Sequence, residues 1–398
     1  MKRFVICLDG TWNNASKENE RDDGSKVFRP TNVLKMARAT EKFDKNGVLQ
    51  ITYYDEGVGA MNRAPNMRTR MVRFFDNKLG GGWGAGFETN IEEAYTFLAN
   101  NYDHGDEIFV FGFSRGASQA RSLCNLIEWA GGFPAKSDVY YLPRIISAYL
   151  ETQGQGDVSP MIEAINQRRQ ARNDPPLEPF LVPNMAFLGV WDTVLALGSR
   201  VQAREGSSKK AYQFHTPSTP PRSVKTIRHA LAIDERRHDF QPEIFSGSGA
   251  CKDFEQRWFA GVHSNVGGGL MDDSLANCAL RWMCEQATAR GLALNPDYLK
   301  FFRCYAAGKA SEKTVFYKTS DALMRPIRGF HGIRQLSAAP NASIDKSVLD
   351  RLNAKPAEHK NLGEAYRPEN LLAYLAVNPD YDQVLSPDLL ALVRQKRH

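Results

Sequence analysis

The sequence predicts an α/β fold in which a mostly parallel central sheet is flanked by helices. Short apolar runs alternate with longer segments of helical periodicity, as in parallel strands joined by crossover helices. Several of the apolar runs end in polar or glycine-containing loops, and open parallel sheets place their functional residues at that edge. The composition, 42% hydrophobic and 24% charged over 398 residues, provides enough apolar material for a substantial core.

The expected strands are short apolar runs that stop at a turn or at a polar side chain. In chain order they are residues 3–8, 50–55, 107–112, 186–191, 224–233 and 257–262. Helical periodicity is expected at 31–42, at 87–100 and directly after residue 116. The chain after residue 272 is expected to be largely helical and then irregular.

We expect a single domain over residues 1–398, with the core strands within 1–270 and a largely helical C-terminal portion at 272–398. Insertions with a different composition are expected at 60–86, 134–180 and 198–223. The glycine-rich end of the first insertion lacks the Lys-Ser/Thr pair of a phosphate-binding loop, so nucleotide binding is not expected there.

The most informative motif is the pentapeptide Gly112-Phe113-Ser114-Arg115-Gly116, which follows an apolar strand and leads into a helix. This G-x-S-x-G sequence in a strand–turn–helix context is typical of a nucleophile elbow, a strained turn that exposes a serine hydroxyl. The adjoining helix N-terminus would supply backbone N–H groups for a developing oxyanion. The alternative is a serine that only caps a helix after a buried strand.

A nucleophilic serine needs a base and an acid that orients the base, and other predicted strand ends offer both. His263 follows the run 257–262 and enters a glycine-rich loop. Asp192 and Asp234 each end an apolar run, so either could be the acid. The chain order Ser114, Asp192, His263 is the one that α/β-hydrolases use.

The first predicted strand ends at Asp9, and the loop that follows corresponds to the place where this fold supplies a second oxyanion donor. Gly10 or Thr11 is the candidate donor there, together with the N–H of Arg115. Asp9 itself is expected to organise the loop. No cofactor is expected, and no Cys/His spacing indicates a metal site.

The bulk properties exclude several other classes of protein. The net charge of +6 is modest, and no nucleic-acid-binding motif is present. Basic side chains cluster at 63–73, 168–172 and 209–228. These clusters are expected to be solvated faces, with peripheral contact to an anionic membrane as the alternative. The six cysteines are sparse, which predicts buried reduced thiols. The apolar run at the N-terminus is too short for a signal peptide, and no segment has 18 uninterrupted apolar residues, so we expect a protein made in the cytoplasm.

Several motifs in order resemble the uncharacterised α/β-hydrolase family that contains the type VI secretion lipase effectors. The resemblance covers nearly the whole chain. It rests on CLDGTWN at 7–13, TNI at 89–91 with AY at 94–95, FGFSRGA at 111–117, GVWDTV at 189–194, HALAIDERR at 229–237, GVHSNVGGG at 261–269, SVLDR at 347–351 and YRPENL at 366–371.

This resemblance implies an α/β-hydrolase fold and the cleavage of phospholipid esters. It places the triad at Ser114, Asp192 and His263, and it therefore favours Asp192 over Asp234 as the acid. An acyl-chain groove would then be walled by Trp12, by Phe113 and by the insertion at 134–180, the place for a cap. The resemblance also implies a lipid or other acyl-ester substrate, an inhibitor (immunity) protein as partner, and export by a contractile secretion system. The chain departs from the family at Asn265, where an aspartate is usual.

Overall fold

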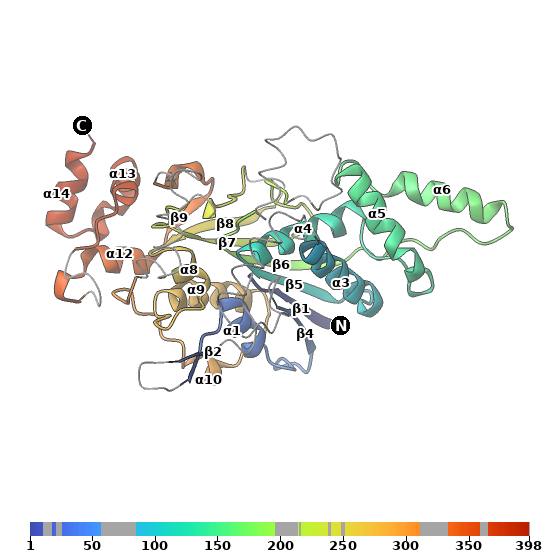
Figure 1. Cartoon of the computed structure of the whole chain (residues 1–398), viewed down its shortest axis with the longest axis horizontal. Coiled ribbons are helices and arrows are strands. Elements are labelled where there is room, and N and C mark those ends of the chain that lie inside the picture. The colour runs from blue at the N-terminus through green and yellow to red at the C-terminus, as the bar shows by residue number, and fades with distance from the viewer. Residues whose placement is uncertain are drawn as a thin grey trace.

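The structure, a computed structural model, describes residues 1–10, 18–20, 26–56, 85–195, 214, 216–237, 240–247, 251–310, 333–358 and 365–397. A seven-stranded sheet lies at its centre (Figure 1), and each pair of neighbouring strands runs parallel. Across the sheet, the order is β4 (Leu49–Asp55), β1 (Lys2–Leu8), β5 (Glu107–Phe113), β6 (Asn184–Trp191), β7 (Thr226–Ala232), β8 (Asp253–Phe259) and β9 (Ala342–Ile344). The predicted α/β fold with a mostly parallel sheet flanked by helices is confirmed.

The central strands are almost continuously apolar because both faces of the sheet are covered. Successive side chains of a strand point to opposite faces. On β1, Phe4 and Ile6 therefore belong to one buried cluster, while Val5 and Cys7 belong to the other. The first cluster packs against α3 (Ala85–Asn101) and α4 (Arg115–Trp129), and the second against α1 (Asn32–Ala39) and α9 (Ala276–Ala289).

The insertion at 134–180 forms helices at the end of the sheet where the strands begin. It contains η1 (Lys136–Tyr141), α5 (Leu142–Thr152) and α6 (Ser159–Gln170). Phe133 and Leu181 exchange backbone hydrogen bonds of 3.0 and 2.7 Å just before β6, so the insertion leaves and re-enters the fold at that edge. Figure 1 shows α5 and α6 at the right-hand end of the molecule, while α8 (His263–Gly267) lies to the left of the sheet.

The C-terminal portion packs as a third apolar cluster against β7 and β8, and it contributes the short edge strand β9. β9 lies outside residues 1–270, where the sequence pattern predicts the core strands. The remaining elements are β2 (Glu18–Glu20) and β3 (Lys26–Phe28), which form a hairpin, α10 (Pro296–Leu299), η3 (Leu336–Ala338), α12 (Lys346–Asn353), η4 (Pro356–Glu358), α13 (Glu369–Val377), η5 (Pro379–Val384) and α14 (Pro387–Gln395).

The cysteine prediction is wrong for one pair, because Cys278 of α9 and Cys304 form a disulfide. Cys304 follows α10 in an irregular segment that returns over α9, a contact that the sequence pattern does not show. Cys7, Cys124, Cys251 and Cys284 are buried and free, as predicted.

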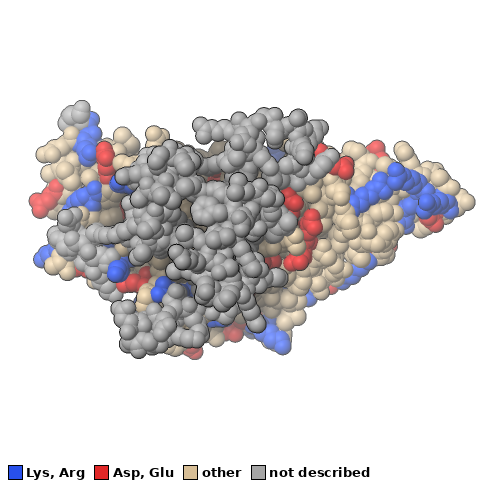
Figure 2. Space-filling model, in the orientation of Figure 1, with Lys and Arg blue, Asp and Glu red and all other residues tan. Residues whose placement is uncertain are grey.

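The basic cluster at 168–172 lies on the end of α6, where Figure 2 shows blue side chains on the arm at the right. Arg168 and Arg172 are exposed, whereas Arg169 donates to Asp138 and Tyr140. The cluster at 63–73 lies outside the described residues. None of the helices in the described ranges is long and apolar enough to span a bilayer.

Candidate active site

Ser114 sits at the turn between β5 and α4, at the carboxyl-terminal edge of the sheet. Its backbone has φ 59° and ψ −123°, a combination that L-residues rarely adopt. The turn is held by two hydrogen bonds, from the Ser114 N–H to the carbonyl of Trp191 and from the Val194 N–H to the carbonyl of Ser114, at 3.0 and 3.3 Å. The serine predicted from G-x-S-x-G therefore has the strained backbone of a nucleophile elbow.

Both glycines of the pentapeptide are required by close backbone packing. A β-carbon at Gly112 would lie 2.3 Å from the carbonyl oxygen of Gly116. A β-carbon at Gly116 would lie 2.1 Å from the carbonyl oxygen of Leu8 and 2.5 Å from that of Asp9. The elbow is therefore pressed against the end of β1, which brings Asp9 to the same edge of the sheet as Ser114.

Gly116→Ala is expected to destabilise the fold by about 3 kcal/mol or more, because backbone atoms of β1 cannot move aside as a side chain could. Gly131→Ala is the matched control at the other end of α4. Gly131 has φ 68° and open space around it, so alanine there should lose only about 1–2 kcal/mol. Urea unfolding measures both variants. Equal losses would show that the elbow is not tightly packed on β1.

His263 is the first residue of α8 and is buried. Its ring lies against Phe113, the neighbour of Ser114, with 4.6 Å between the ring centroids. Gly267 permits this approach, since a β-carbon there would fall 1.9 Å from the Phe113 ring. The Nδ1 atom of His263 pairs with Oδ2 of Asp192 at 2.7 Å, whereas Nε2 is buried without a hydrogen-bond partner among the described residues. One ring nitrogen is thus held and the other is left for another group.

Asp192 directly follows β6, is fully buried and has φ 38°. Its Oδ1 accepts from the Ala232 N–H at 3.0 Å and from Arg334 Nη1 at 2.7 Å. Its Oδ2 accepts from Arg334 Nη2 at 3.1 Å as well as pairing with His263. Burial would raise the pKa of Asp192, but the charge of Arg334 and the hydrogen bonds of the carboxylate together hold that pKa well below its usual range. Asp192 is therefore a carboxylate at neutral pH.

Asp234, the other candidate acid, lies in a different environment. Its Oδ2 accepts from the Gly261 N–H at 2.6 Å and from the Tyr366 hydroxyl at 2.8 Å. Burial raises its pKa above the ordinary value. Asp234 thus ties the turn before His263 to the C-terminal portion, whereas the structure brings Asp192 to the imidazole.

The backbone N–H groups that the sequence predicts as oxyanion donors differ in their surroundings. Arg115 is the first residue of α4, so its N–H lies at the N-terminus of that helix, directly after Ser114. The Gly10 N–H donates to Oδ1 of Asp9 at 2.6 Å and is engaged. Asp9 also accepts from Thr31 and Tyr54, consistent with an organiser of its loop. Thr11 lies outside the described residues.

Two supporting side chains do not emerge from the sequence reasoning. Glu235 accepts the backbone N–H of His263 at 3.2 Å, and its place directly after Asp234 in the AIDERR motif is a signal that could have found it. Arg334 lies 142 residues beyond Asp192, outside every motif that the sequence reasoning singled out, so no local signal indicates it. A third contact comes from Phe240, whose ring packs T-shaped against His263 with 4.8 Å between the ring centroids.

The predicted acyl-groove walls are only partly in place. Phe113 lies at the site, against His263 and Gly267. The insertion at 134–180 lies at the other end of the sheet, so it does not form the expected wall or cap (Figure 1). The insertion follows the C-terminal end of α4 and precedes the N-terminal end of β6. Both of these ends are remote from Ser114, so the insertion emerges at the edge of the sheet opposite the site. Trp12 lies outside the described residues.

The carboxyl-terminal edge of the sheet thus carries a serine after β5, a buried carboxylate after β6 and a histidine after β8. No group of His, Cys, Asp and Glu side chains in the described ranges is arranged to hold a metal ion. The chemistry that these residues can perform is proton transfer from a serine hydroxyl to a histidine whose other nitrogen is fixed by a carboxylate.

A family model and a relative of known sequence match parts of this chain. The model of the family described as "T6SS, Phospholipase effector Tle1-like, catalytic domain" matches residues 2–286. An uncharacterized protein of Saccharomyces cerevisiae, YEL023C, is 34% identical over 133 residues, which are 33% of this chain and 18% of that protein. The chain thus matches less than a fifth of that relative's length.

Two solved structures are similar to this chain at low identity. The first, the Tle1 effector bound to the VgrG spike of the type 6 secretion system, is 15% identical, with a TM-score of 0.45 over 81% of this chain and 78% of that one. The second, an uncharacterized protein from Pseudomonas aeruginosa, is 16% identical, with a TM-score of 0.43 over 99% of this chain and 61% of that one.

Proposed function

The chain belongs to the Tle1-like family of type VI secretion system phospholipase effector catalytic domains, and we propose that it is a serine esterase that cleaves acyl esters of phospholipids. The observation that carries the catalytic part of the proposal is the geometry of His263. Its Nδ1 is paired with buried Asp192 at 2.7 Å, and its Nε2, which has no hydrogen-bond partner among the described residues, belongs to a ring packed on the neighbour of Ser114.

In the proposed reaction, Nε2 of His263 takes the proton of the Ser114 hydroxyl while Oγ attacks the acyl carbonyl carbon. The Arg115 N–H and an N–H of the loop after Asp9 stabilise the oxyanion, with Thr11 as the preferred residue because the Gly10 N–H donates to Asp9. His263 then gives its proton to the departing alcohol, which is a lysophospholipid, and an acyl-serine remains. Water, deprotonated by His263, releases the fatty acid and restores Ser114.

Membership of the family also motivates proposals on location and partners. We propose that a type VI secretion system exports the protein, that it meets its substrate at a membrane surface, and that an immunity protein restrains it. The exposed arginines at the end of α6 are candidates for contact with anionic headgroups.

The substrate class is tested by comparing two esters. We expect the protein to release fatty acid and lysophospholipid from phosphatidylethanolamine/phosphatidylglycerol vesicles at least about 10³-fold faster than its Ser114→Ala variant. p-Nitrophenyl butyrate serves as the soluble ester. Turnover of that ester alone would indicate an esterase with a small substrate. Rates equal to those of Ser114→Ala on both esters would indicate a non-catalytic protein on this fold.

A further inference from the structure

Arg334 approaches the proposed acid from the C-terminal portion of the chain, beyond residues 2–286 that match the family model. It lies in the segment before η3 and is only 8% exposed. Its two terminal nitrogens make four hydrogen bonds of 2.6–3.1 Å. The acceptors are Oδ1 and Oδ2 of Asp192 and the carbonyl oxygens of Ala232 and Phe240.

These acceptors belong to parts of the site that must be held relative to one another. Asp192 follows β6, Ala232 ends β7, and Phe240 carries the ring that packs T-shaped against His263. A guanidinium is a rigid planar fork, so it fixes the plane of the carboxylate as well as its position. Arg334 thereby sets the direction from which Oδ2 meets the imidazole.

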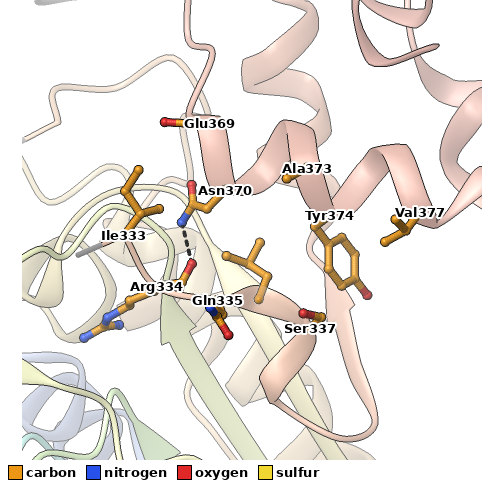
Figure 3. A pocket seen from close by; sticks show the side chains of 10 residues that line it. Ile333, Arg334, Gln335, Ser337, Glu369, Asn370, Ala373, Tyr374 and Val377 are labelled. Atoms are coloured by element: carbon orange, nitrogen blue, oxygen red, sulfur yellow. Dashed lines mark hydrogen bonds between the residues drawn. The ribbon is translucent and has the colours of Figure 1, made fainter. Parts of the chain in front are cut away.

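The backbone of Arg334 is itself anchored. Asn370 of α13 donates to the carbonyl of Arg334 at 3.1 Å and to the carbonyl of Ile233 at 3.0 Å, which joins the segment to the end of β7. In Figure 3 the Arg334 side chain points away from α13, while its neighbours line an open pocket of about 410 Å³ against that helix. The backbone of the segment is therefore tied to α13, while the Arg334 side chain reaches the Asp192 carboxylate on the other side.

We infer that Arg334 is a positioning residue for the proposed triad: it orients the Asp192 carboxylate toward His263 and offsets part of the negative charge that Asp192 places beside the imidazole. This inference rests on the proposed function of Asp192 and His263. Charged groups of the described residues around His263 also include Glu235, which accepts the His263 backbone N–H, and Arg237, which pairs with Glu235 and stacks on Phe240. Asp234 accepts from the Gly261 N–H in the turn before His263.

The direction of the expected pH effect of replacing Arg334 follows from the charges of Arg334 and Asp192. Without Arg334, the buried negative charge of Asp192 faces His263 alone and favours the protonated imidazole, which cannot act as a base. Arg334→Gln should therefore lower kcat/KM for p-nitrophenyl butyrate on the order of 10²-fold near pH 7. The loss should be larger at pH 6 and smaller at pH 9, so that the acid limb of the profile moves up by about one pH unit or more.

Arg334→Lys separates charge from geometry. Lysine keeps the positive charge but cannot present two parallel donors, so it should restore the wild-type acid limb while leaving kcat reduced. Arg351→Gln is the matched control, because Arg351 is also a fully buried arginine of the C-terminal portion, yet it donates to the carbonyls of Ala306 and Gly308. It should lower thermal stability without moving the acid limb.

A measurement that needs no turnover separates this inference from the proposed function. Proton NMR follows the ring signals of His263 as the pH is changed, and these signals are assigned by their absence from His263→Asn. The Ser114→Ala protein is compared with the double variant Ser114→Ala/Arg334→Gln. The ring signals should report protonation at a higher pH in the double variant. An unchanged response, or an identical shift in Arg351→Gln, overturns the inference. If the ring response moves but the wild-type protein hydrolyses no ester, then the positioning role stands and the proposed function fails.

Discussion

Ser114→Ala is expected to reduce ester hydrolysis by about 10⁴- to 10⁶-fold, to the level that binding and oxyanion stabilisation alone support. Alanine removes the only atom that can form the acyl-enzyme in the proposed reaction. The strained backbone at φ 59° is set by packing of the elbow on β1, so the fold should remain intact. Initial rates with p-nitrophenyl butyrate measure the loss, and thermal unfolding checks the fold.

Ser118→Ala is the matched control, since Ser118 lies one turn along α4 and is also buried. Its hydroxyl donates to the carbonyl of Val194 at 2.7 Å, so its loss should lower stability by about 1 kcal/mol and leave turnover close to wild type. Ser114→Ala protein that kept most of its activity would remove Ser114 from the reaction.

Asp192→Asn is expected to lower kcat on the order of 10⁴-fold, as replacing the acid does in well-studied triads. The asparagine amide would no longer fix the imidazole tautomer that leaves Nε2 able to accept a proton. It would also leave the buried charge of Arg334 without its counter-ion, so we expect a loss of stability of about 3 kcal/mol or more. Steady-state kinetics and urea unfolding measure the two effects.

Asp234→Asn provides the comparison for the other candidate acid. An asparagine oxygen can still accept from Gly261 and Tyr366, so both contacts of Asp234 should survive the change. Turnover should therefore fall less than about tenfold, by way of a modest shift in the turn before His263. If Asp234→Asn were the more damaging change, the role of the acid would pass to Asp234.

The sheet could be predicted largely from sequence where its strands are buried on both faces. β1, β5 and β6 are continuous apolar runs, and the predicted ranges 3–8, 107–112 and 186–191 agree with them within two residues. β8 is different, because its alternate side chains are only half buried and include Glu255 and Arg257. The apolar pattern therefore begins late and runs past Phe259, and it places this strand at 257–262. The three-residue edge strand β9 is too short to have a pattern.

The residues of the candidate site likewise differ in how far the sequence could predict them. Ser114, Asp192 and His263 could be proposed because each follows a strand in a motif, and parallel strands bring their ends to one edge. Arg334 could not, because its contact with Asp192 depends on how the C-terminal helices pack against the sheet. The position of the 134–180 insertion could not be predicted either, because composition does not indicate at which edge of a sheet an insertion emerges.

The most direct test of the central claim is reaction with a fluorophosphonate, followed by digestion and mass spectrometry of the labelled peptide. We expect one adduct per chain, on Ser114, formed by attack of its oxygen on phosphorus with loss of fluoride. The adduct should be absent from Ser114→Ala and strongly slowed in His263→Asn. Undiminished labelling of Ser114→Ala, or an adduct on another residue of the wild-type protein, would contradict the assignment of Ser114 as the nucleophile.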